Sequence, residues 1–147
     1  MLIKTISSAL QGIDAYVVEV EVDIGNGLPD YVVVGLPDAS VRESKERVRG
    51  AIKNCGYDFQ PRKVTINLAP AARRKEGPAF DLAIALGHLV FLEIIRADSL
   101  RDYMFLGELA LDGRIKPVKE CFQRPSWPRP AGSRGSSSLA TTRRKPP

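Results

Sequence analysis

Few of the side chains that usually carry enzyme or metal chemistry occur in this sequence. His88 is the single histidine, and the two cysteines, Cys55 and Cys121, have no metal-ligating neighbours. With this single histidine, most zinc sites and histidine-based catalytic triads are excluded. His88 also lies among apolar residues, which favours a core position over a ligand role. We therefore expect no metal site and no cofactor in this chain.

A basic cluster is the clearest candidate for binding. Arg73, Arg74 and Lys75 are consecutive in a polar loop, and Arg62 and Lys63 lie only one predicted strand away. Placed cations of this kind contact nucleic-acid phosphates, so these five residues are the candidate nucleic-acid site. The alternative is an ordinary solvated loop, because no aromatic residues alternate with the cations to stack on bases.

Two acidic residues and one thiol have simpler interpretations. Asp81 is placed at the start of an apolar helix, where the helix dipole favours a structural carboxylate over a catalytic one. Glu108, between Gly107 and an apolar residue, is interpreted as a structural carboxylate near the end of a sheet. Cys55 precedes Gly56 at a predicted helix end and is interpreted as an ordinary thiol.

The charge distribution divides the 147-residue chain into two parts. Residues 1–119 contain 16 basic and 16 acidic residues, whereas residues 120–147 contain six basic residues and one acidic residue. The second part also holds five of the eleven prolines and lacks apolar periodicity. A segment of this composition cannot bury enough apolar surface to offset its ordering entropy. We predict one neutral domain at 1–119 and a disordered basic tail at 120–147.

The first half of the domain alternates strands with one amphipathic helix. Residues 16–23 alternate apolar and acidic side chains, which predicts a half-exposed strand. The β-branched run Tyr31–Val34 predicts a buried strand. Ser40 and Glu43 have the spacing of a capping box and predict a helix over about 40–54. Val41, Val48, Ala51 and Ile52 form the apolar stripe of that helix.

The second half predicts another strand, a buried helix and a hairpin. Val64–Leu68 is a short strand, and Pro78–Ile95 is a helix that is apolar nearly all round. Met104–Leu109 and Arg114–Val118 are strands joined through Asp112-Gly113, a strong hairpin-turn pair. Together these elements predict an α+β sheet with two packed helices.

The sequence also bears on membranes and compartment. The longest apolar stretch, Leu82–Ile95, is interrupted by polar residues and is shorter than the ~20 residues that cross a bilayer. The first residues lack the pattern of a signal peptide. We expect no membrane partner and a reducing cytoplasm.

Three separated segments are similar to one bacterial family. They are Pro29–Asp38, Asn67–Ala71 continuing into Lys75–Leu82, and Leu106–Val118. Together they resemble the N-terminal domain of the magnesium-chelatase-like AAA+ proteins of the YifB/ComM family. The resemblance covers residues 1 to about 119. It implies a Lon-protease-like α+β fold placed ahead of an ATPase module. For the competence members it also implies DNA processing by branch migration in natural transformation, in the bacterial cytoplasm.

The same resemblance bears on peptidase chemistry. Lon-type peptidases place a nucleophilic serine directly after a Lys-Asp-Gly-Pro turn, with a lysine as its base. Here the turn is Lys75-Glu76-Gly77-Pro78, and Ala79 occupies the nucleophile position. Alanine has no atom that attacks a carbonyl. A diverged Ser-Lys peptidase is therefore the weaker alternative, and we expect no catalytic residue.

The sequence departs from the family in two respects. It lacks a Gly-x-x-x-x-Gly-Lys-Ser/Thr phosphate loop, so ATP and Mg²⁺ are implied only for the family's separate ATPase module. After Lys119 the family pattern stops, but codons for Glu120–Arg124 preceded by one extra G can be reread as that pattern. We interpret residues 120–147 as out of frame, in a chain truncated before the ATPase.

The function that follows is a non-catalytic N-terminal module. Its expected partners are the ATPase module or subunits of the parent protein, with DNA and a second copy as further candidates. The alternative is a free-standing nucleic-acid-binding domain.

Overall fold

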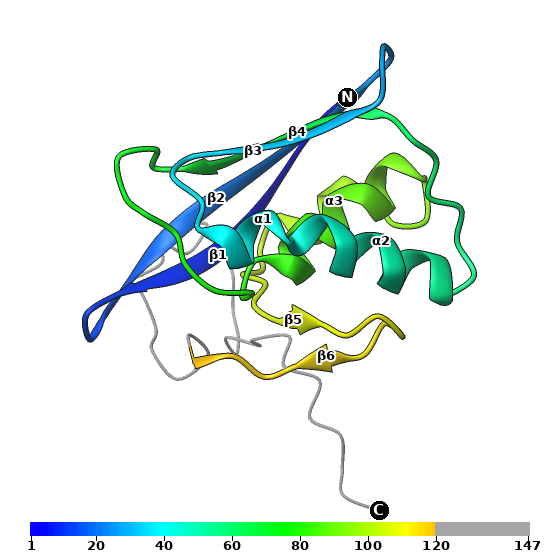
Figure 1. The fold of residues 1–147 in the computed structure, drawn as a ribbon. Coiled ribbons are helices and arrows are strands. Elements are labelled where there is room, and N and C mark those ends of the chain that lie inside the picture. Colours follow the sequence, from blue (N-terminus) through cyan, green and yellow to red (C-terminus); the bar gives the residue numbers. More distant parts are fainter. Residues whose placement is uncertain (120–147) are drawn as a thin grey trace, which may run out of the picture.

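The computed structural model describes residues 1–119, and the predicted tail at 120–147 lies outside the described residues. Strands and helices are mixed along this part of the chain, which confirms the predicted α+β class (Figure 1). In chain order the elements are β1 (Leu2–Gln11), β2 (Asp14–Gly25), β3 (Asp30–Val34), α1 (Ala39–Arg42), α2 (Ser44–Asn54), β4 (Lys63–Ala69), α3 (Asp81–Phe91), the 3₁₀ turn η1 (Ala97–Leu100), β5 (Glu108–Leu109) and β6 (Ile115–Lys116).

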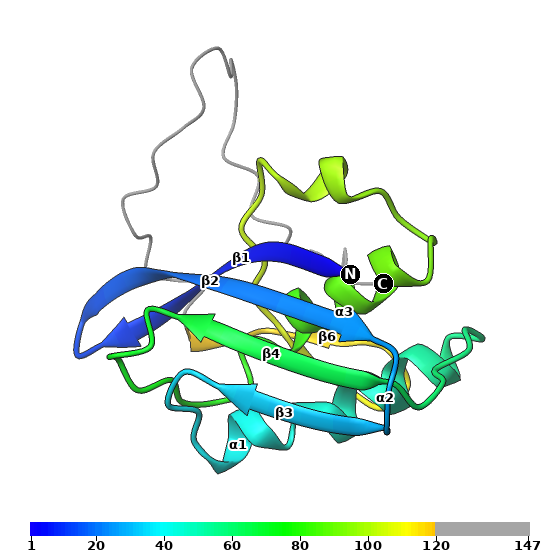
Figure 2. The same ribbon diagram turned by 90° about the horizontal axis from the view of Figure 1, so that it is seen from above.

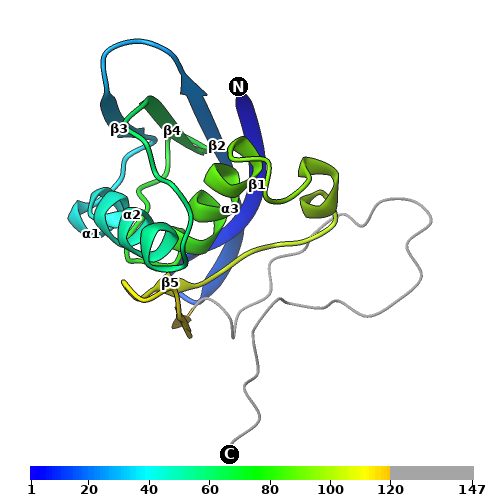
Figure 3. The same ribbon diagram turned by 90° about the vertical axis from the view of Figure 1, so that its right-hand side faces the viewer.

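The main sheet has four strands in the order β1-β2-β4-β3 (Figure 2). β2 pairs antiparallel with both of its neighbours, with Val20 opposite Leu68 on β4. β3 pairs parallel with β4, so the chain crosses over between them through α1 and α2. The helices lie on one side of this sheet (Figure 3).

The core fills the space between the sheet and the helices. The predicted alternation on β2 is confirmed, because Val18, Val20 and Val22 are fully buried. β4 contributes its alternate residues in the same way. The predicted helical stripe is also confirmed, since Val41, Val48, Ala51 and Ile52 are all buried.

The prediction of a buried strand at Tyr31–Val34 is wrong. β3 is the edge strand of the sheet, and Val32 and Val34 are 40% and 42% exposed. The helices cover only the face that carries Tyr31 and Val33. A β-branched run alone does not distinguish a central strand from an edge strand.

The predicted capping box is wrong as well. Asp38 caps the helix, because its Oδ1 accepts a hydrogen bond from the backbone N–H of Val41 at 2.8 Å. The helix is interrupted at Glu43, which separates α1 from α2. Aspartate is as good an N-cap as serine, and Asp38 stands two residues before Ser40.

The apolar helix is shorter than predicted. α3 begins at Asp81 rather than Pro78 and ends at Phe91 rather than Ile95. Just beyond it, Glu93 has φ +60°, which no α-helix accommodates. Eight of the eleven residues of α3 are buried, so the predicted interior position of this helix is confirmed.

The last two predicted strands are mostly irregular and form their own two-stranded sheet. The backbone of residues 104–107 forms hydrogen bonds outside this small sheet. The N–H of Phe105 donates to the carbonyl of Ile6 on β1, and the N–H of Gly107 donates to the carbonyl of Ala79. Pro117 has no N–H to continue the ladder, which ends β6 at Lys116 instead of Val118. The predicted Asp112-Gly113 turn is present, with Gly113 at φ +90°.

None of the helices within residues 1–119 is both long enough and apolar enough to cross a membrane.

Candidate functional site

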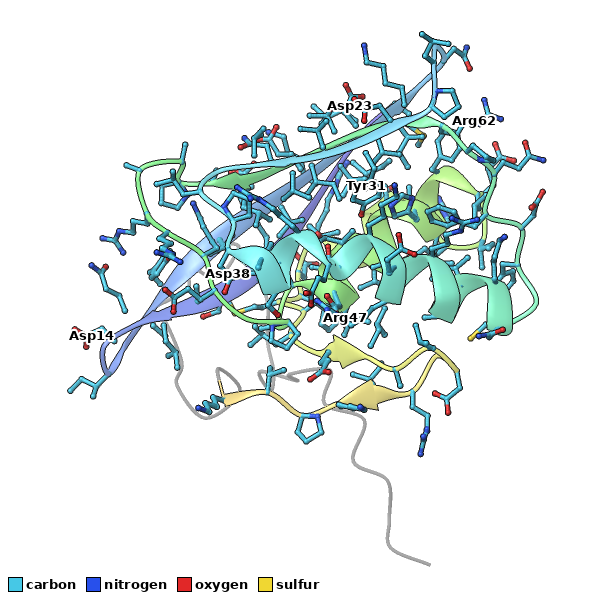
Figure 4. The ribbon with its side chains drawn as sticks, in the orientation of Figure 1. Asp14, Asp23, Tyr31, Asp38, Arg47 and Arg62 are labelled. Atoms are coloured by element: carbon cyan, nitrogen blue, oxygen red, sulfur yellow. The ribbon has the colours of Figure 1, made fainter. Side chains whose placement is uncertain are left out.

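The first two family-like segments meet directly in the structure. The backbone of Lys75 accepts a hydrogen bond from Asp38 at 2.9 Å and donates one to Leu36 at 3.0 Å. The side chain of Asp38 also reaches this loop, and its Oδ2 accepts from the N–H of Gly77 at 3.2 Å. The loop after β4 is therefore fastened to the β3–α1 turn (Figure 4).

Lys75 does not lie on the surface of this loop. Its side chain is fully buried, and its Nζ donates to the carbonyls of Gly35 and Pro70. Burial lowers the pKa of this amine below its usual value. The expectation of an exposed Arg73-Arg74-Lys75 cluster is wrong at Lys75, because its ammonium serves the two backbone turns that enclose it.

The second and third segments are joined through one carboxylate. Asp81 is fully buried at the start of α3. Arg47 of α2 donates to it through Nε at 2.6 Å and Nη2 at 3.0 Å, and Leu109 of β5 donates its backbone N–H at 3.1 Å. The prediction of a structural carboxylate accounts for this arrangement, although a guanidinium rather than the helix dipole alone is its main partner.

Opposing effects act on this pair. Burial raises the pKa of Asp81, while the hydrogen bonds from Arg47 and Leu109 act to lower it. For Arg47, burial acts to lower the pKa, but Asp81, with smaller contributions from Glu108 and Glu43, outweighs it and raises the pKa. Glu43 and Arg47 also form an i, i+4 ion pair, at 3.6 Å.

The backbone between Ala79 and Leu82 completes the connection. Gly107 donates to the carbonyl of Ala79 at 3.0 Å and accepts from the N–H of Leu82 at 3.2 Å. Ala79 itself is 1% exposed and packs with Leu106 and Val118. The position that resembles a nucleophile site therefore holds a buried methyl group.

We call this assembly the motif junction: residues 35–38, 75–82 and 107–109, together with Arg47. All four carboxylate oxygens of Asp38 and Asp81, and the amine of Lys75, are engaged in hydrogen bonds inside it. These three ionisable side chains therefore connect the loops and helices of the domain to one another.

The five candidate nucleic-acid residues do not converge. Arg62 and Lys63 are at the beginning of β4, and Arg73 and Arg74 follow its other end. β4 runs over Lys63–Ala69, which separates its ends by about 20 Å at the usual strand rise. Arg73 lies over the ring of Tyr16 at 4.6 Å, while Arg74 pairs with Glu76 at 3.4 Å.

The remaining predicted residues are in three separate places. His88 is buried in α3, as predicted, but its Nε2 has no hydrogen-bond partner in the structure. Burial lowers the pKa of His88 to about 4. Cys55 is exposed at the end of α2, and Glu108 is half-buried on β5. Within residues 1–119 no three acidic, histidine or cysteine side chains are grouped as a metal site.

Sequence reasoning missed two functional parts of the junction. Arg47 is not part of the predicted apolar stripe of this helix, yet its side chain is only 17% exposed. Its position three residues after Ser44 and four before Ala51, both buried, places it at the border of the apolar stripe. The predicted cap is Ser40 and not Asp38, although the place of Asp38 directly before a helix is the usual one for an N-cap.

Comparison with known proteins finds one family and several long relatives. Residues 20–126 match the family described as subunit ChlI of Mg-chelatase. The uncharacterized protein YifB of Salmonella typhimurium is 47% identical over 110 residues, which are 75% of this chain and 22% of that protein.

Two further relatives are similar over comparable lengths. The competence protein ComM of Haemophilus influenzae is 41% identical over 112 residues, or 76% of this chain and 22% of that protein. An uncharacterized protein of Mycobacterium tuberculosis is 39% identical over 131 residues, which are 85% of this chain and 26% of that protein. The chain spans about a quarter of the length of the curated relatives it matches.

Proposed function

Because this chain belongs to the family of the ChlI subunit of Mg-chelatase, which includes YifB and ComM proteins, we propose that it is a non-catalytic module of a larger AAA+ protein. In this proposal it positions the ATPase subunits or their substrate and carries out no reaction itself. We propose likewise that its fold is of the Lon-protease type and that the peptidase chemistry of that type has been lost.

The motif junction is the observation that supports a non-catalytic role. An active site needs a nucleophile or a base with a free lone pair facing a substrate. Lys75 is instead buried against two carbonyls, Asp81 is held by Arg47, and Ala79 offers only a methyl group. In this proposal the residues that carry the family resemblance stabilise the fold by hydrogen bonds and packing inside the domain.

We further propose that the parent protein processes DNA in natural transformation, in the bacterial cytoplasm. The support is the name of the H. influenzae relative, a competence protein, with 41% identity. ATP and Mg²⁺ would then be bound by the ATPase module and not by residues 1–119.

A segment exchange tests the proposal. The matching segment of the H. influenzae competence protein is replaced by residues 1–119 of this chain, and transformation frequency is measured against a strain in which that segment is deleted. We expect the exchanged protein to transform well above the deletion strain. An exchanged protein that accumulates normally but transforms no better than the deletion would contradict the proposal.

A second measurement addresses catalysis alone. The purified chain is incubated with ATP and with an unstructured protein such as casein. We expect neither to be hydrolysed. Peptide cleavage that disappears in a Lys75→Met variant that still folds would show that the buried amine is a catalytic base and would overturn the non-catalytic role.

A further inference from the structure

A pocket of about 300 Å³ lies outside the motif junction, between the end of α3 and the segment that leads into β4. Ile24 and Val64 line it from the sheet, His88 and Phe91 from α3, and Phe59 and Arg62 from the connecting segment. An apolar cavity of ~150 Å³ accepts a benzene ring, and binding pockets generally begin near 300 Å³. The space therefore suits one substituted or fused ring.

The inner wall of the pocket is aromatic. His88 stacks on Tyr31, with centroids 6.2 Å apart, and packs at a tilt of 46° against Phe59, with centroids 5.0 Å apart. Its Nε2 is buried without a hydrogen-bond partner in the structure, although native proteins rarely leave such an atom unpaired. Nε2 itself is covered by its neighbours, so His88 contributes to the aromatic wall and not a hydrogen bond through this atom.

Arg62 supplies the charge of this pocket. Its guanidinium lies over the ring of Phe91 at 5.6 Å, and Nη1 donates to Asn26 at 3.1 Å. No carboxylate within residues 1–119 forms an ion pair with it, so most of its donors are available to an anion. The acidic residue in the wall, Asp58, accepts a hydrogen bond from Gln60 at 2.8 Å.

We propose that this pocket binds a small planar aromatic anion. The ring packs against the apolar wall beside Phe59 and His88, and the anionic group accepts hydrogen bonds from Arg62. The flat guanidinium suits a carboxylate or a phosphate, because both accept two parallel hydrogen bonds. The inference is independent of the proposed function, since the motif junction contributes no residue to the pocket.

The single histidine makes the test direct. The imidazole signals of the full chain belong to His88 alone and can be followed by NMR without further assignment. Indole-3-carboxylate and adenosine 5′-monophosphate are titrated as anionic probes, with indole-3-carboxamide and adenosine as neutral matches. We expect a saturable shift of the His88 signals with at least one anion and weaker binding of its neutral match. Comparing the two anions distinguishes a carboxylate ligand from a phosphate ligand.

Two substitutions locate the site. Arg62→Gln should weaken binding of the anion about tenfold or more, as expected for a lost charge-assisted hydrogen bond, while Arg62→Lys should weaken it less. Arg73→Gln is the matched control, because Arg73 also lies over an aromatic ring but at the other end of β4. The proposal is overturned if no probe shifts His88 saturably, if anion and neutral match bind equally, or if Arg73→Gln acts like Arg62→Gln.

Discussion

Arg47 and Asp81 form a two-bond ion pair, at 2.6 and 3.0 Å, that joins the middle of α2 to the first residue of α3. The Asp81 side chain is 1% exposed, and the same carboxylate also accepts the N–H of Leu109. One buried charge thus connects three elements that are far apart in sequence. Two of them involve family-like segments, because α3 begins within Lys75–Leu82 and β5 lies within Leu106–Val118.

Removing the guanidinium should be costly because it leaves Asp81 buried and uncompensated. We expect Arg47→Ala to lower the free energy of unfolding by about 3 kcal/mol. Arg49→Ala, an exposed arginine on the same helix, should change it by less than about 0.5 kcal/mol. Urea denaturation of both variants measures the difference, and equal effects would show that the pair is not the connection described here.

Gly35 should tolerate no side chain. Its φ is +101°, and an added Cβ would lie 2.3 Å from the carbonyl oxygen of Leu68. Gly12 has φ +65° with nothing near the same position, so it separates backbone strain from steric overlap. Gly12→Ala should cost about 1 kcal/mol, whereas Gly35→Ala should cost more than the ~3 kcal/mol upper range for strain alone. Thermal or urea unfolding compares them, and similar losses would contradict the close approach.

Lys75 should behave as a core residue. Lys75→Met leaves the carbonyls of Gly35 and Pro70 without their donor and should cost about 1–3 kcal/mol. Lys63→Met, on an exposed side chain, should be nearly neutral. Acetylation of the native protein, followed by mass spectrometry, should modify Lys63 well before Lys75. Early modification of Lys75 would place its amine on the surface.

His88 should make stability depend on pH. Burial lowers its pKa to about 4, whereas in the unfolded chain it is near the usual 6.5. Between these values the unfolded state binds the proton and the folded state does not, so stability falls as pH decreases from about 6.5 to 4. The slope for this one group is about 1.4 kcal/mol per pH unit.

The check on this pH dependence is the variant His88→Phe, which cannot bind the proton. Urea midpoints from pH 7.5 to 4.5 should decline less steeply in this variant than in the native chain. NMR titration of the single imidazole gives the folded pKa directly. A folded pKa near 6.5 would remove the basis of the prediction.

Local patterns in the sequence predicted most of the elements. The alternation of Val18, Val20 and Val22 and the stripe from Val41 to Ile52 each depend on neighbours a few residues away, so periodicity reveals them. Whether a strand lies at the edge or in the centre of the sheet cannot be found in this way, because it depends on which strands pair beside it. Nothing within Tyr31–Val34 encodes that neighbour.

The motif junction shows the same division. Asp81 at a helix start and Ala79 in place of a nucleophile could be identified by position. The pairing of Asp81 with Arg47, 34 residues away, could not, because its hydrogen bonds exist only after α2 and α3 pack together. The burial of Lys75 is hidden from the sequence for a related reason. A lysine between charged neighbours is usually exposed, and only the fold encloses this one.

DNA binding by the full chain, if measured, should depend on residues 120–147 more than on the folded part. Residues 1–119 have equal numbers of basic and acidic residues, and the cations near β4 are divided between its two ends. Each neutralised phosphate adds about 0.9 to the slope of log K against log salt on duplex DNA. Arg73→Gln with Arg74→Gln should therefore reduce the slope by at most about 2.

Replacing the basic residues of segment 120–147 by glutamine should reduce that slope further, because they are more numerous. These residues are Arg124, Arg129, Arg134, Arg143, Arg144 and Lys145. Salt titrations of the native chain and both variants on one duplex separate the contributions. Binding that survives the six substitutions but is lost with Arg73 and Arg74 would show that the loop after β4 is a phosphate site of the fold. Binding lost only with the six substitutions would mean that the affinity belongs to the tail sequence and carries no information about the family's function.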